Sequence, residues 1–170
     1  MKHLFVIRHG DYKGKDLSDL GRDQIRRIAD DMKVIVGNGY NGHYLLSSPV
    51  IRAEQTAEII AQAFGLETFE RNIQLFVNNG TAEELKAIDG MITPHNNNDI
   101  VTIITHQDVV GTYPRHIVRT LFGRNYDLRI PNKGEGVHLD LEAKRYQMLP
   151  FKGEGVHLDL EGKAYQMRPF

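Results

Sequence analysis

The sequence contains no cysteine among its 170 residues. This absence excludes disulfide bonds, thiol catalysis and thiolate metal ligands. It suits a reducing compartment, since extracellular proteins of this size often depend on disulfides. We therefore expect a cytoplasmic protein.

Long hydrophobic runs are also missing. Near the N-terminus only residues 4–7 are continuously apolar before Arg8 introduces charge, and no later stretch approaches the length of a membrane span. An excess of charge of either sign is missing as well, because the formal net charge is −1. These features predict no membrane partner and no nucleic-acid partner.

The apolar segments instead suggest strands that alternate with helices. Short apolar runs at 4–7, 44–46 and 100–104 are typical of buried parallel strands, and residues 66–69 suggest another short strand. Helical spacing predicts helices that begin after Ser18 or Asp19, near Pro49, near 82–92 and over 109–121. The expected fold is a three-layer α/β/α sandwich with a mainly parallel sheet.

Polar residues follow three of these strands directly. Arg8 and His9 come after the first strand, residues 47–52 after the second, and His106 after the strand at 100–104. Because parallel α/β sheets bind ligands beyond the carboxyl ends of their strands, we expect these groups to meet in one site.

The C-terminus carries a tandem repeat. Residues 133–151 and 152–170 differ only at Ala143/Gly162, Arg145/Ala164 and Leu149/Arg168, so sixteen of nineteen positions match. Each copy alternates apolar and polar residues and predicts a β-hairpin. We expect a domain over 1–151 followed by a duplicate hairpin over 152–170, with His138 and His157 on solvated faces. A spare hairpin competing for one sheet edge suggests a homodimer.

The tripeptide Arg8-His9-Gly10 combines groups that phosphoryl transfer requires. A neutral imidazole can attack phosphorus near neutral pH, and a guanidinium grips phosphate oxygens in pairs. Gly10 would let the backbone approach the ligand closely and turn sharply. The tripeptide alone is weak evidence, because it also occurs by chance.

Four segments in order make the evidence specific. The sequence resembles the histidine phosphatase superfamily, also called phosphoglycerate-mutase-like, over most of residues 3–150. The segments that carry the resemblance are Val6-Ile7-Arg8-His9-Gly10-Asp11, Leu17-Ser18-Asp19-Leu20-Gly21-Arg22-Asp23-Gln24, Ser47-Ser48-Pro49-Val50-Ile51-Arg52-Ala53-Glu54-Gln55-Thr56-Ala57 and the strand that ends at Thr105-His106.

The resemblance implies a role for each matching residue. His9 would be the phosphorylated nucleophile, while Arg8, Arg52 and a cationic His106 would form the phosphate pocket. Gly10 and Ser18 are further candidates for substrate binding. No metal and no other cofactor is implied, since the two arginines and the second histidine supply the positive charge.

One departure from the family pattern bears on the substrate. Many members carry a glutamate in a Leu-x-Glu context, whereas this chain has Leu75-Phe76-Val77-Asn78-Asn79-Gly80. An alkoxide leaving group needs a general acid, but a phosphohistidine can release neutral imidazole once its other ring nitrogen is protonated. The chain is also too short for large cap insertions. Both features resemble the SixA-type phosphohistidine phosphatases.

Several alternatives stay open at this point. Asp11, Glu83 or Glu84 could still supply a proton, although for Asp11 we favour a pocket-edge or structural carboxylate over the acid. The leading function is removal of phosphate from phosphohistidine on a protein. The alternatives are a broad phosphomonoesterase for small metabolites or phosphoproteins and a non-catalytic phosphate-binding module. Three cations that follow the Arg8-His9-Gly10 tripeptide, Lys13, Lys15 and Arg22, either attract anionic substrates or form a solvated face.

Overall fold

The computed structural model describes residues 1–76, 79–125 and 129–150, and the backbone of two short strands at 156–158 and 164–166. A central six-stranded sheet has the order β5-β4-β6-β1-β7-β8. Its strands are β1 (His3–Arg8), β4 (His43–Ser47), β5 (Glu70–Arg71), β6 (Ile100–Thr105), β7 (Gly136–Asp140) and β8 (Arg145–Leu149).

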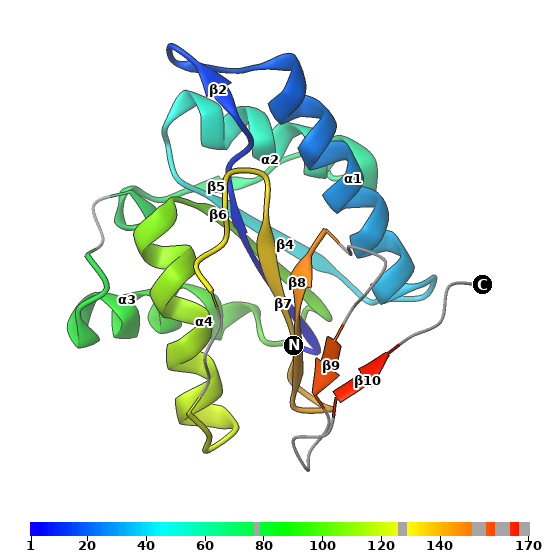
Figure 1. Cartoon of the computed structure of the whole chain (residues 1–170), viewed down its shortest axis with the longest axis vertical. Helices are drawn as coiled ribbons and strands as arrows, with labels where there is room; N and C mark the ends of the chain where they lie inside the picture. The colour runs from blue at the N-terminus through cyan, green and yellow to red at the C-terminus, as the bar shows by residue number, and fades with distance from the viewer. Residues whose placement is uncertain (77–78, 126–128, 151–155, 159–163, 167–170) are drawn as a thin grey trace.

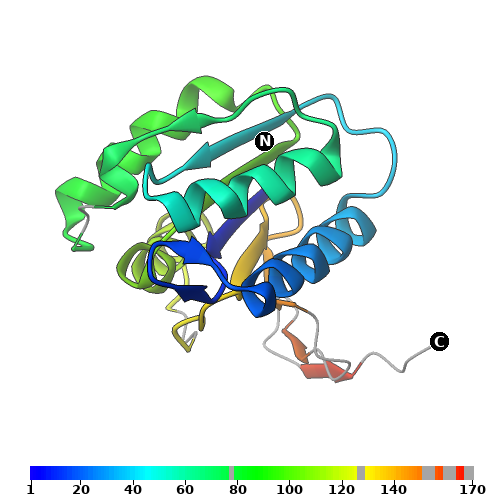
Figure 2. The ribbon, with the colours of Figure 1, turned by 90° about the horizontal axis from the view of Figure 1, so that it is seen from above.

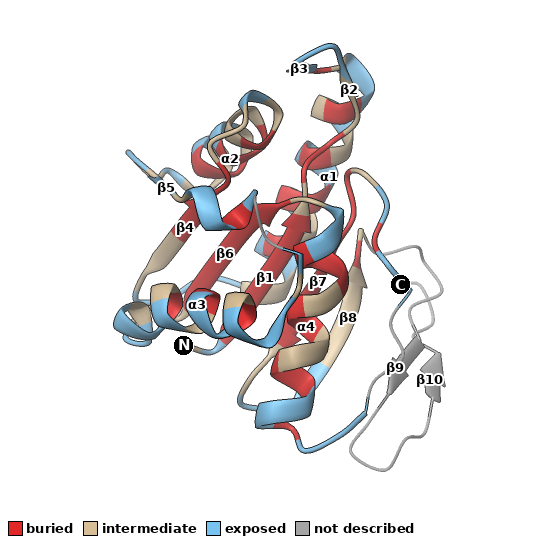
Figure 3. Ribbon diagram, turned by 90° about the vertical axis from the view of Figure 1, so that its left-hand side faces the viewer, coloured by how far each residue is buried: buried red, intermediate tan, exposed pale blue. Residues whose placement is uncertain are grey.

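The sheet is parallel through its centre and antiparallel at one side. Strand β1 pairs in parallel with β6, which pairs in parallel with β4, and β4 pairs in parallel with β5. Strand β7 runs antiparallel to β1, and β8 runs antiparallel to β7. The buried central strands β1 and β6 are continuous in Figure 3, as the apolar runs predict.

Four helices cover the two faces of this sheet (Figure 1). They are α1 (Asp19–Val36), α2 (Ile51–Phe64), α3 (Ala82–Ile92) and α4 (Gln107–Leu121), with two 3-10 turns at η1 (Ile73–Leu75) and η2 (Thr93–His95). One core cluster joins α3 and α4 to the sheet, and a second joins α1 and α2 to its opposite face. The expected three-layer α/β/α sandwich is confirmed, and Figure 2 shows the layers from above.

Local sequence explains where α1 begins. The Ser18 side chain accepts a hydrogen bond from the Gly21 amide and caps the helix, which is the first of the two caps expected. Helix α2 begins at Ile51, two residues after Pro49, and ends at Gly65 in the left-handed conformation. Helix α4 begins at Gln107, two residues earlier than expected, and includes Pro114.

Two expectations about the sheet are wrong. The short strand predicted at 66–69 lies instead at Glu70–Arg71, because Leu66 and Phe69 pack beside the core under α2. The alternating pattern predicts a solvated His138, but this residue is only 4% exposed. Its ring stacks on Phe5, with the centroids 4.6 Å apart, and its Nε2 lies 3.0 Å from His3 Nδ1.

The remaining strands form two small sheets. Strands β2 (Tyr12–Lys13) and β3 (Asp16–Leu17) make a hairpin between β1 and α1 that the sequence did not suggest. Strands β9 (Val156–Leu158) and β10 (Ala164–Gln166) pair antiparallel, as the repeat predicts, in a two-stranded sheet of their own. The division into a domain over 1–151 and a duplicate over 152–170 stays a prediction.

Candidate active site

The three predicted strand ends meet as expected. Arg8 at the end of β1 lies in register with Thr105 at the end of β6, and Ser47 of β4 lies in register with Ile104. The His9 amide donates to the Thr105 carbonyl at 3.1 Å, which ties the loop after β1 to the loop after β6. Strand register therefore places His9, Arg52 and His106 together.

His9 is oriented for attack through its Nε2 atom. Its Nδ1 lies 2.8 Å from the Gly10 carbonyl oxygen, which can only accept, so Nδ1 carries the proton. Nε2 is then unprotonated, and its lone pair accepts a hydrogen bond from Arg52 Nε at 2.9 Å. The residue is 3% exposed, and burial, aided by Arg52 and Arg8, lowers the pKa of His9 to about 4. The imidazole is thus a neutral nucleophile at physiological pH.

His106 lies beside His9 and is also neutral. The two ring centroids are 5.0 Å apart. Arg52 Nη2 donates toward His106 Nδ1 at 3.4 Å, and His106 Nε2 donates to Ser48 Oγ at 2.8 Å. Burial first, then the neighbouring His9 and Arg52, lowers the pKa of His106 to about 3. His106 is therefore neutral in the free site, and because a bound phosphate dianion would raise its pKa, its expected cationic role during transfer stays a prediction.

Arg8 keeps one donor nitrogen without a partner within the ranges that the structure describes. Its Nη1 donates to the Pro131 carbonyl at 3.1 Å and its Nη2 to Gln107 Oε1 at 3.0 Å. Among the described residues, the buried Nε of Arg8 has no hydrogen-bond partner. Because a buried unpaired donor is costly, this nitrogen is suited to a phosphate oxygen.

Two helices add to the positive potential here. Helix α2 begins one residue before Arg52, and α4 begins immediately after His106. Within the described part of the chain, neither helix has a side-chain hydrogen bond at its N-cap. A helix N-terminus carries partial positive charge and free amide groups, both of which favour an anion. The site can therefore bind a phosphoryl group and present it to His9.

Gly10 is required for a different reason from the one expected. A Cβ at Gly10 would lie 2.6 Å from the Gly21 carbonyl oxygen, and one at Gly21 would lie 2.0 Å from the Asp11 carbonyl oxygen. The two glycines thus let the loop after β1 pack directly on the first turn of α1. Ser18 belongs to this packing too, since it caps α1 and donates to Asp11 Oδ2 at 2.9 Å.

The proposed acids differ in their surroundings. Asp11 accepts from Ser18 and from Lys133 Nζ, and these two hydrogen bonds keep its pKa below the usual value. Glu84 accepts from Thr81 in the capping box of α3, which likewise lowers its pKa. Glu83 is exposed in the same turn. Val77 and Asn78, in the stretch that lacks the family glutamate, lie outside the described residues.

Several residues of the site were missed by sequence reasoning. Tyr12 packs its ring edge-on to His9, with centroids 5.3 Å apart, and lies under the Arg52 guanidinium at 4.7 Å. Lys133 approaches the same ring at 4.2 Å. Gln107 holds Arg8, and Phe76 packs against His106 with the ring centroids 5.1 Å apart. Apart from the contact between Tyr12 and His9, these contacts join residues distant in sequence, so no local pattern predicts them.

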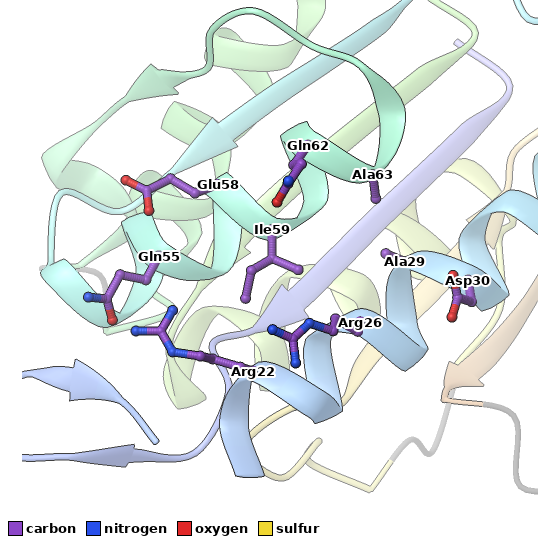
Figure 4. A pocket seen from close by; sticks show the side chains of 9 residues that line it. All are labelled: Arg22, Arg26, Ala29, Asp30, Gln55, Glu58, Ile59, Gln62 and Ala63. Atoms are coloured by element: carbon purple, nitrogen blue, oxygen red, sulfur yellow. The ribbon is translucent and has the colours of Figure 1, made fainter. Parts of the chain in front are cut away.

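Away from these residues, a pocket lies between α1 and α2 (Figure 4). Arg22 and Arg26 of α1 line it together with Gln55 and Glu58 of α2. Arg22, one of the cations considered for attracting anions, therefore lines this pocket.

In the described part of the chain, no helix is long and apolar enough to cross a membrane.

Comparisons with known proteins agree with this geometry. A model of the histidine phosphatase superfamily (branch 1) matches residues 4–73. The structure resembles a SixA protein from Agrobacterium tumefaciens, with a TM-score of 0.61 and 15% identity over 88% of this chain and 97% of the other. It also resembles a phosphoglycerate mutase from Plasmodium falciparum, with a TM-score of 0.57 and 22% identity over 96% and 98%.

A third similar structure is the protein histidine phosphatase SixA in complex with tungstate. Its TM-score is 0.55, with 18% identity over 97% of this chain and 94% of the other. No curated relative matches the sequence. At these identities the solved structures establish the fold.

Proposed function

Because a histidine phosphatase superfamily model matches residues 4–73 and the fold is similar to that of a phosphoglycerate mutase, we propose that the chain hydrolyses phosphorylated substrates through a phosphohistidine at His9. The observation that carries this proposal is the unprotonated Nε2 of His9: the Gly10 carbonyl keeps the proton on Nδ1, and the Nε2 lone pair faces Arg52. Arg8, Arg52 and His106 surround the position that a phosphoryl group would take.

The reaction would proceed in two displacements. His9 Nε2 forms a bond to phosphorus as the bond to the leaving group breaks, and the leaving group departs with the electron pair. Water then attacks the phosphohistidine, which releases inorganic phosphate and restores the imidazole. Arg8 and Arg52 would bind the equatorial oxygens, where charge is spread in the transition state. His106 would gain a proton as the dianion raises its pKa.

The substrate class follows from the leaving group. The stretch from Leu75 to Gly80 contains no carboxylate, and Asp11 is held as a carboxylate by Ser18 and Lys133. Such a site favours a leaving group that departs neutral. We therefore infer phosphohistidine on a protein as the substrate. The solved neighbours include both a protein histidine phosphatase and a glucosyl-3-phosphoglycerate phosphatase, so the choice rests on this argument.

Intact-protein mass spectrometry after brief exposure to phosphoramidate tests the nucleophile. The wild-type chain should carry a transient, acid-labile phosphate at neutral pH, and His9→Ala should not. Turnover that persists unchanged in His9→Ala would overturn the mechanism. Phosphate binding without any label on His9 would instead indicate a non-catalytic phosphate-binding module.

A comparison of substrates tests the substrate class. We expect a phosphohistidine protein to be hydrolysed in preference to alkyl phosphates, because an alkoxide leaves poorly without a general acid. Preferred hydrolysis of alkyl phosphates would favour the broad phosphomonoesterase and contradict the argument from the missing acid.

A further inference from the structure

Asp11 and Lys133 form an ion pair beside the nucleophile. Lys133 Nζ donates to Asp11 Oδ1 at 3.2 Å, and Ser18 Oγ donates to Asp11 Oδ2 at 2.9 Å. The Tyr12 backbone amide also donates to this carboxylate, so each oxygen has at least one donor. A carboxylate offers about four acceptor positions, so this arrangement fixes Asp11 as an anion and leaves capacity for a further donor.

Contacts on Tyr12 connect this pair to the reacting groups. The Tyr12 ring packs on His9, the Arg52 guanidinium lies over it, and Lys133 Nζ lies 4.2 Å from its centroid. The Gly134 amide next to Lys133 donates to the His9 carbonyl at 2.9 Å. The segment that carries Lys133 is therefore attached to the backbone of the nucleophile itself.

Exposure increases from the nucleophile to the ion pair. The His9 residue is 3% exposed, whereas the Asp11 and Lys133 side chains are 32% and 37% exposed. The pair thus lies toward solvent from His9. A substrate that brings its phosphoryl group to a buried His9 must keep its leaving group on the solvent side.

The chemistry of a departing imidazole fits this position. As the bond from His9 Nε2 to phosphorus forms and the substrate P–N bond breaks, the electron pair returns to the substrate ring. The ring leaves as neutral imidazole only if its other nitrogen already carries a proton. A fixed carboxylate that accepts this N–H stabilises the protonated ring, whereas the same carboxylate has no proton to give an alkoxide.

We propose that Asp11 is a specificity-determining residue, which accepts the N–H of the departing imidazole, and that Lys133 is the positioning residue that holds it there. This inference rests on the proposed phosphohistidine phosphatase activity and names the group that selects its leaving group. It predicts a site that discriminates by the charge and hydrogen bonding of the leaving group.

The test is the ratio of kcat/KM for a phosphohistidine peptide to kcat/KM for p-nitrophenyl phosphate, whose leaving group has no N–H. A ratio cancels any change in the folded fraction. In Asp11→Asn the ratio should fall about tenfold or more, because a hydrogen bond to a charged group is lost. Lys133→Met should lower the ratio in the same direction, and Lys133→Arg should restore most of it.

The repeat supplies a matched control, since Lys152 occupies in the second copy the position that Lys133 has in the first. Lys152→Met should keep the wild-type ratio. An unchanged ratio in Asp11→Asn, with His9 still labelled by phosphoramidate, would overturn this inference alone. A higher ratio would also overturn it. If wild-type His9 is never labelled, the proposed function itself fails.

Discussion

The two copies of the C-terminal repeat have nearly the same sequence but different places in the structure. Residues 133–151 contribute β7 and β8 to the six-stranded sheet, where β7 pairs with β1. Residues 152–170 contribute β9 and β10, which pair with each other in a separate sheet. The same hairpin sequence therefore belongs to the six-stranded sheet in one copy and to a separate two-stranded sheet in the other.

The first copy also contacts the candidate active site. The Glu135 carbonyl accepts from the Arg8 amide, and the Gly134 amide donates to the His9 carbonyl, both at 2.9 Å. Lys133 pairs with Asp11. Sequence similarity alone thus says little about the role of a segment, because the role depends on the backbone to which the segment is attached.

One of the three sequence differences between the copies falls at a position that is buried in the first copy. Leu149 is 1% exposed in the core under α1 and α2, and its counterpart is Arg168. Ala143 and Arg145, the other two differing positions of the first copy, are not buried. An arginine in the place of Leu149 would bury a charge without a partner. This substitution favours the first copy for the place beside β1.

The largest effect is therefore expected from Leu149→Arg. We expect the free energy of unfolding to fall by about 3 kcal/mol or more, since a buried cation is added and apolar packing is lost. Urea denaturation would measure it. Arg168→Leu, the matched change in the second copy, should have a much smaller effect, because β9 and β10 pair outside the six-stranded sheet. Equal losses in both variants would show that the two copies are structurally equivalent.

Acid should destabilise the part of the molecule that contains the first copy. Burial lowers the pKa of His3, of His9 to about 4 and of His106 to about 3. A histidine whose folded pKa lies below its unfolded value contributes its full stability above about pH 6.5 and loses it as the pH falls. A tenfold difference in proton affinity between the folded and unfolded chains corresponds to about 1.4 kcal/mol, so the loss should reach a few kcal/mol near pH 4.

Urea denaturation at about pH 7 and about pH 5 separates these histidines from most carboxylates, which titrate lower. The decrease in unfolding free energy should be the same in the full chain and in a chain that lacks residues 152–170, because the three histidines belong to the domain with the first copy. It should be smaller in His9→Gln. A decrease that disappears with the second copy would assign the acid sensitivity to that copy.

A smaller effect is expected at the histidines of the repeat. His138 is buried, stacks on Phe5 and has ring nitrogens within hydrogen-bond distance of His3 and Gln147. His138→Ala should lower the free energy of unfolding by about 2 kcal/mol, as expected for lost packing and hydrogen bonds. His157→Ala is the matched control and should change it less. A larger loss for His157→Ala would contradict the assignment of the structural role to the first copy.

These contrasts also show how far the sequence alone could lead. Strand ends, the Ser18 cap and the meeting of His9 with His106 follow from local patterns and from the geometry of parallel sheets. The role of Lys133 depends on contacts with residues distant in sequence. Its own segment is nearly identical to the one around Lys152, so local sequence does not distinguish the two lysines. Burial of His138 was missed because an alternating strand was assumed to have one solvated face, whereas both faces of β7 are covered.

The charge of His106 in the free site could not be predicted from the sequence for a related reason. The family role suggests a cation, but the charge of a histidine depends on how far the fold excludes water and on nearby cations. Here burial, the neighbouring His9 and Arg52 together lower the pKa. Residue type and order are sufficient to identify such a histidine, whereas its protonation requires the packed structure.

The smallest effect on chemistry is expected from removing the second copy altogether. A chain without residues 152–170 keeps Lys133, Gly134 and Glu135, which contact the site, so its rate with phosphoramidate should stay within about twofold of the wild-type rate. We propose, however, that the second copy adds its hairpin to another chain and forms a homodimer, since an edge strand offers unpaired backbone groups. Light scattering on both chains measures this independently of activity. A halved mass after the deletion would support the dimer, whereas an unchanged mass would contradict it. A large loss of activity would show that the second copy also belongs to the catalytic domain.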